Sequence, residues 1–176
     1  MNFSTKNSDP HKTTINMVSR TINWKNAILA GIIGTILFDI VGLLFTGKWW
    51  DIPAILGAKT GLGLAYGVIG HYSNGILLAV LFAGIAPSLW GPKWARPLIF
   101  AVGETVALVW LFMLPLLGAG VAGLDLSPMM PLITLVRHLV YAVPLIFFIQ
   151  YDYKSLKLND NENYLKVENR LIEIKF

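Results

Sequence analysis

The chain contains no cysteine and few charged residues. Without cysteine it can form no disulfide, thiolate metal site, iron–sulfur cluster or cysteine nucleophile. Charged residues fill 14% of the 176 positions, whereas soluble domains average about 25%. Hydrophobic residues fill 55%. A single domain of this composition has too little polar surface to cover itself in water, so the sequence predicts an integral membrane protein.

Four apolar segments are long enough to cross a bilayer, which takes about 20 residues. They cover 26–46, 64–85, 97–117 and 129–149. The predicted fold is therefore an all-α membrane protein, a bundle of four transmembrane helices over 26–149. A polar arm, 1–25, precedes the bundle and a charged tail, 150–176, follows it. In this tail, Ile172, Ile174 and Phe176 alternate with charged residues, a pattern typical of a strand.

The positive charges are distributed unevenly along the chain. Of the 14 Lys and Arg residues, eleven lie in the arm, in the loop between the second and third segments, and in the tail. In an up-and-down bundle these regions share one side of the membrane, and the other side holds only Lys48 and Lys59. The positive-inside rule places both termini in the cytoplasm and the bundle in the inner membrane. Contact with anionic lipid accounts for these charges, so no nucleic-acid partner is expected.

Every apolar segment contains at least one ionisable side chain, and such residues are rare in hydrocarbon because burying charge is costly. The five are Asp39, His71, Glu104, Arg137 and His138. At a rise of about 1.5 Å per residue, four of them lie about 10–14 Å below the outer face and Glu104 about 20 Å below it. This convergence indicates a functional polar layer. In the alternative, Asp39 and Arg137 form a buried ion pair that fixes helix packing, and the histidines hydrogen-bond between helices.

The two halves of the bundle resemble each other. The first and third segments each carry an acid, and the second and fourth each carry a histidine. Two tandem helical hairpins would produce this pattern.

Three short motifs resemble an uncharacterised family of small bacterial four-helix membrane proteins. They are Asp51-Ile52-Pro53 in the first loop, Gly70-His71 with Gly75 in the second segment, and Arg137-His138-Leu139-Val140-Tyr141 in the fourth. The resemblance covers about 25–149. It implies that the two histidines belong to a recurring pattern, and it implies no activity.

Three functions are compatible with these residues. The first is a non-catalytic accessory or structural subunit of a larger membrane complex or homo-oligomer, which the small size and the lack of a catalytic motif favour over an enzyme. The second is a protein that handles protons or a solute, or an enzyme acting on a lipid-soluble substrate, in which histidine relays protons.

The third function is cofactor binding. His71 and His138 lie at one depth on helices that are diagonal in an up-and-down bundle, so they are candidate axial ligands of a b-type haem. Arg137 would then meet a propionate and Asp39 would orient a histidine N–H. A divalent metal held by Asp39, His71 and His138 is the variant of this hypothesis.

Overall fold

The computed structural model describes residues 16–20, 22–149 and 153–157. Two units are distinct, a helical membrane domain and a short two-stranded ribbon. In the ribbon, β1 (Asn16–Arg20) pairs antiparallel with β2 (Tyr153–Lys157), and Met17 lies opposite Leu156. The strand expected at 172–176 lies outside the described residues.

The membrane domain contains four helices that are long and apolar enough to cross a bilayer, which confirms the predicted all-α four-helix bundle. The first is α1 (Trp24–Thr46) and the second is α3 (Gly63–Ile85), which continues into the 3₁₀ turn η1 (Ala86–Ser88). The third span joins α4 (Arg96–Glu104), η2 (Thr105–Met113) and α5 (Leu114–Leu116). The fourth is α6 (Met130–Phe148). A further 3₁₀ turn, η3 (Val121–Gly123), lies between the last two spans.

Local sequence signals set the ends of these helices. The Asn23 side chain caps α1 by accepting a hydrogen bond from the Asn26 N–H at 3.2 Å, which satisfies one of the free donors of the first turn. Gly47 ends the same helix in a left-handed conformation at φ 68°, where a glycine avoids the steric penalty of a Cβ. Pro97 and Pro131 stand in the first turns of the third and fourth spans, where proline loses no helical hydrogen bond.

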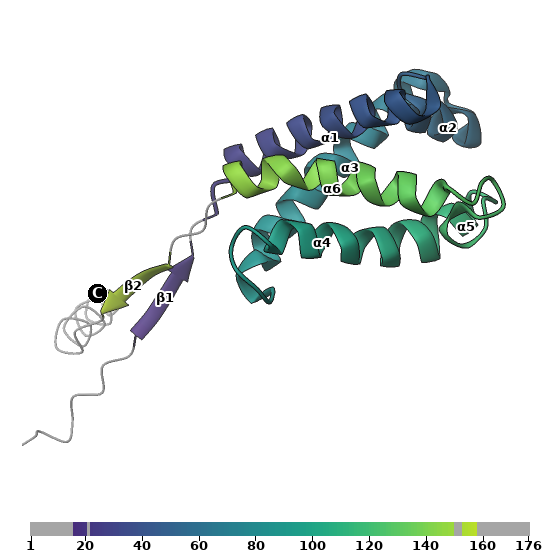
Figure 1. Ribbon diagram of the computed structural model, residues 1–176. Helices are drawn as coiled ribbons and strands as arrows, with labels where there is room; N and C mark the ends of the chain where they lie inside the picture. The colour runs from purple at the N-terminus through teal and green to yellow at the C-terminus, as the bar shows by residue number, and fades with distance from the viewer. Residues whose placement is uncertain (1–15, 21, 150–152, 158–176) are drawn as a thin grey trace, which may run out of the picture. The chain divides into compact units, whose positions relative to one another are not determined.

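The spans pack in the order α3, α1, α6 and third span. α1 packs against α3 and α6, and α4 packs against α6. Figure 1 shows α1, α6 and α4 running alongside one another while α3 crosses them. Small residues allow the close approach: a Cβ at Gly75 of α3 would collide with the Thr35 hydroxyl of α1. Among the described helices, α3 and the third span stand at the two ends of this order and do not pack closely against each other.

The loop between the first two spans contains an additional helix, α2 (Asp51–Thr60), which the apolar pattern does not predict. It lies along the start of α3, where Gly67 faces the Pro53 carbonyl so closely that any side chain there would clash. Trp50 precedes it at φ 57°, a conformation that is strained for a bulky residue. This turn directs Asp51, the first residue of α2, toward the bundle.

Candidate functional site

The five ionisable residues predicted within the membrane are all buried in the bundle. Together with a sixth residue, Asp51 of α2, they form three pairs of opposite chemistry, each joining two elements. The pairs are Asp39–His71, Asp51–Arg137 and Glu104–His138.

The first pair joins α1 to α3. His71 Nε2 lies 3.0 Å from Asp39 Oδ1, and the Tyr72 hydroxyl donates to Asp39 Oδ2 at 3.2 Å. An ionised carboxylate only accepts hydrogen bonds, so Nε2 of His71 carries the proton in this arrangement and Nδ1 is the free acceptor. Asp39 therefore fixes the orientation of His71, as predicted for a carboxylate beside a functional histidine.

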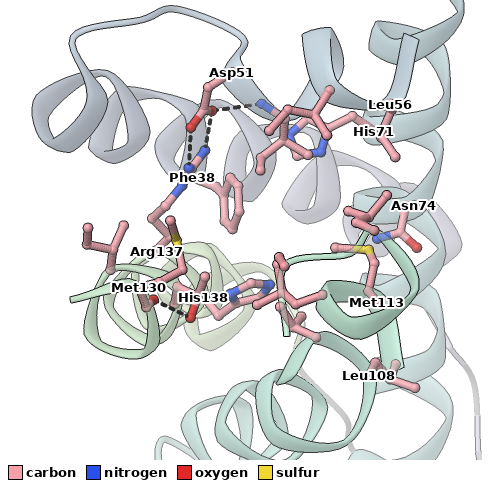
Figure 2. Close-up of a pocket in the computed structure, with 18 of the residues that line it drawn as sticks. Phe38, Asp51, Leu56, His71, Asn74, Leu108, Met113, Met130, Arg137 and His138 are labelled. Carbon is pink, nitrogen blue, oxygen red and sulfur yellow. Dashed lines mark hydrogen bonds and ion pairs between the residues drawn. The ribbon is translucent and has the colours of Figure 1, made fainter. Parts of the chain in front are cut away.

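The second pair differs from the expectation. Arg137 makes two parallel hydrogen bonds to Asp51 of α2, each 2.8 Å long, and not to Asp39. The guanidinium also lies over the Phe38 ring, with Cζ 4.1 Å from the ring centroid. Gly42 leaves the room for it, since a Cβ at that position would overlap the guanidinium. The bidentate geometry matches the planar fork of arginine, and Figure 2 shows Arg137 reaching from α6 to Asp51.

The third pair joins the third span to α6. His138 Nδ1 lies 2.6 Å from the Thr134 carbonyl oxygen, and Nε2 lies 3.6 Å from Glu104 Oε1. That last separation exceeds hydrogen-bond length, and Glu104 Oε1 has no other partner among the described residues. The depth estimate sets Glu104 apart from the other four residues, whereas the structure brings it to His138.

Phe38 lies between the two histidines. Its ring centroid is 5.4 Å from that of His71 and 4.9 Å from that of His138. The polar residues are thus arranged around one aromatic ring. No pattern in the sequence distinguishes Phe38 from the other apolar residues of its span.

A cavity of about 670 Å³ adjoins these groups (Figure 2). All four spans and α2 contribute to its wall, which is mostly apolar. The ionisable residues that line it are Asp51, Lys59, His71, Glu104, Arg137 and His138.

One side of the cavity is open, between α3 and the third span. Three of its lining residues there, Asn74 of α3 with Leu108 and Phe112 of η2, are exposed on the surface of the bundle. Asn74 stands about 16 Å along α3 from its start, at a rise of about 1.5 Å per residue, and thus in the hydrocarbon layer. Two lining residues of α2, Ile55 and Lys59, are exposed as well. The cavity therefore has exposed lining residues both at the depth of the hydrocarbon and beside α2.

The third span changes its hydrogen-bond pattern beside the site. It is α-helical up to Glu104, and η2 is a π-helix in which the N–H of Leu114 bonds to the carbonyl of Val109. The Trp110 indole N–H donates to the Thr134 hydroxyl at 2.8 Å, which links this segment to the residue that holds His138. π-Helical turns are rare and occur often at functional sites.

The cofactor hypotheses find no further support in the geometry. Among the described residues, no group of three His, Asp or Glu side chains is arranged to hold a metal ion. Asp39 contacts His71, while His138 is held by the Thr134 carbonyl and faces Glu104. The haem ligation by His71 and His138 stays a prediction.

The residue that sequence reasoning missed is Asp51. Its motif, Asp51-Ile52-Pro53, stands out in the family resemblance, but its partner Arg137 is 86 positions away.

No family model, curated protein or solved structure matches the chain.

Proposed function

We propose that this multi-pass membrane protein binds a lipid-soluble molecule inside its helix bundle and exchanges protons with it. The observation that supports the proposal is the cavity, which has exposed lining residues at the depth of the hydrocarbon and has Glu104 and two histidines in its wall.

The cavity has the size and the lining of a small-molecule site. Ligand pockets measure about 300–1,000 Å³, and apolar walls with a few convergent polar groups are their usual composition. The volume here is about 670 Å³. An ion pair, Asp51–Arg137, stands in the wall beside the outer end of the site. A bundle built only for packing would fill this space with side chains, because protein interiors are close-packed.

The polar groups suit proton exchange. Imidazole and carboxyl side chains are the commonest general acids and bases. His71 is held by Asp39, and His138 is held by the Thr134 carbonyl. Each histidine thus has one nitrogen fixed and one nitrogen available for a ligand.

The location that we propose is the inner membrane, with both termini in the cytoplasm. The support is the excess of Lys and Arg in the arm, the loop before the third span and the tail.

The test is the identity of small molecules that purify with the protein in mild detergent, measured by solvent extraction and mass spectrometry. Ile133→Trp adds bulk at the cavity wall, and Leu132→Trp, one position along α6, adds the same bulk on a surface that is 50% exposed. We expect one lipid-soluble compound near equimolar amount in the wild type and in Leu132→Trp, and a loss of at least tenfold in Ile133→Trp. An extract with the composition of bulk lipid for all three proteins would contradict the proposal.

The same preparation tests the other two hypotheses, which stay predictions. A stoichiometric protein partner would support the accessory subunit. A Soret band or an equimolar metal would support a haem or metal site.

A further inference from the structure

Glu104 and His138 face each other, but they do not satisfy each other's hydrogen-bonding atoms. The Thr134 carbonyl can only accept, so the 2.6 Å contact requires that His138 Nδ1 carry a proton. In a neutral imidazole, Nε2 is then an acceptor. It faces Glu104 Oε1 at 3.6 Å, which is too long for a direct hydrogen bond.

Glu104 is the least satisfied group in the site. Its side chain is only 4% exposed, it lines the cavity, and its Oε1 has no partner among the described residues. A buried polar atom without a hydrogen bond destabilises the fold, so Glu104 Oε1 calls for a partner that completes it, either a buried water or a ligand of the cavity.

One chemical group satisfies both residues without burying a charge. A hydroxyl has one donor hydrogen and two acceptor lone pairs. A protonated Glu104 can donate to the hydroxyl oxygen, and the hydroxyl hydrogen can be donated to His138 Nε2. Every member of this chain is neutral, which suits a low-dielectric site.

The remainder of the cavity suits an apolar body. Leu108, Val109 and Phe112 of η2 line the wall near Glu104, and Leu78 lines the opposite side on α3. At the lipid-facing opening, Asn74 offers the first polar contact.

We infer that the ligand of this cavity is a hydroxyl-bearing lipophile, an alcohol or a phenol, whose O–H bridges Glu104 and His138. This inference rests on the proposed function, since it specifies the ligand of the same cavity. It assigns Glu104 a binding role that a purely structural ion pair with His138 would not have.

The experiment compares two probes that differ in one hydrogen-bond donor, 4-nonylphenol and its methyl ether 4-nonylanisole. Binding of each radiolabelled probe is measured on the full chain in nanodiscs, and protein-free nanodiscs give the partition blank. We expect the wild type to bind the phenol about tenfold more tightly than the ether, the factor that a hydrogen bond of about 1.4 kcal/mol provides.

Two substitutions separate recognition from packing. Glu104→Leu is expected to reduce phenol affinity about tenfold and to weaken the ether as well, because the ether oxygen can still accept from Glu104, while Glu104→Gln, which can still donate, stays within about threefold of wild type for both probes. Removal of an unsatisfied carboxyl is also expected to raise the Tm in Glu104→Leu, whereas a structural partner of His138 would lower it.

The outcomes are distinct. Equal binding of phenol and ether, with both lost in Ile133→Trp, would overturn the hydroxyl inference and leave the proposed function standing. Binding of neither probe above the blank would overturn both. The comparison of probes on the wild type decides the inference even where Glu104→Leu fails to fold.

Discussion

Two residues far apart in sequence, Asp51 and Arg137, form the ion pair that ties α2 to α6. Their side chains are only 12% and 4% exposed, so neither charge is well solvated. A buried pair is weak as a source of stability, but a buried charge without its partner is costly. The pair therefore fixes the position of α2 against α6, and loss of either residue alone destabilises the fold more than loss of both.

This argument predicts strong coupling between the two positions. Asp51→Leu alone is expected to lower the free energy of unfolding by about 3–5 kcal/mol, because it leaves Arg137 uncompensated. The double variant with Arg137→Met is expected to cost much less than the sum of the single changes. Unfolding in mixed micelles gives the values, and Lys59→Leu on the exposed end of α2 is the control. A cost below about 1 kcal/mol for Asp51→Leu would refute the coupling.

At this scale the sequence identifies the buried ionisable residues but not their partners. Asp39, His71, Glu104, Arg137 and His138 are recognisable because charge is rare in apolar segments. The partners depend on which helix faces meet, and a run that is apolar on all sides does not disclose its faces. Asp51 is not recognisable in the sequence for a different reason. Its segment is too short, and its apolar and polar residues are too mixed, to be identified as part of the membrane domain.

Among the elements, α1 and α3 approach each other closely at a glycine of α3, Gly75. Gly75 faces the Thr35 hydroxyl, and Thr35 itself donates to the Gly31 carbonyl at 2.8 Å. The Tyr141 hydroxyl also donates to the Gly75 carbonyl, at 2.6 Å. One small residue therefore holds three helices in register beside the cavity.

A methyl group at this position is expected to separate the helices. Gly75→Ala should lower the free energy of unfolding by about 1–3 kcal/mol, the usual cost of overpacking. The matched control is Gly70→Ala on the same helix, where an added Cβ meets no atom within 4 Å and alanine favours the helix. Equal stability of the two variants in a thermal unfolding series would show that the contact does not limit helix approach.

The four spans follow from the lengths of the apolar runs, and the structure confirms them. The π-helical stretch η2 does not follow from sequence, because Thr105–Met113 reads as an ordinary apolar helix. Trp110 in this stretch bonds to Thr134 on α6, a tertiary contact that the sequence pattern does not reveal. α2 is likewise fixed by its contacts along α3 and by Asp51, neither of which a local pattern records.

For the whole molecule, the up-and-down order of the spans places α2 at one end of the bundle and η1 at the other (Figure 1). By the positive-inside rule, the distribution of Lys and Arg predicts that the end bearing η1 faces the cytoplasm. α1 and α6 pack against each other, whereas α3 and the third span do not pack closely. The tandem-hairpin pattern therefore stays a prediction.

The absence of cysteine makes this orientation simple to measure. Single cysteines at Ala58, near the end of α2, and at Ser88, in η1, are both exposed. In intact cells a membrane-impermeant maleimide is expected to label Ala58→Cys at once and Ser88→Cys only after permeabilisation. The reverse pattern would place the termini outside.

Because the cavity opens between α3 and the third span, the ligand concentration that determines its occupancy is the concentration in the bilayer and not that in water. A compound that arrives from the bilayer is already enriched there, by about fourfold for each methylene group it carries. A chain of modest length thus reaches the opening at a local concentration far above its level in water. Weak contacts inside the cavity are then enough for high occupancy, and selectivity depends on the few polar atoms that lipid cannot match.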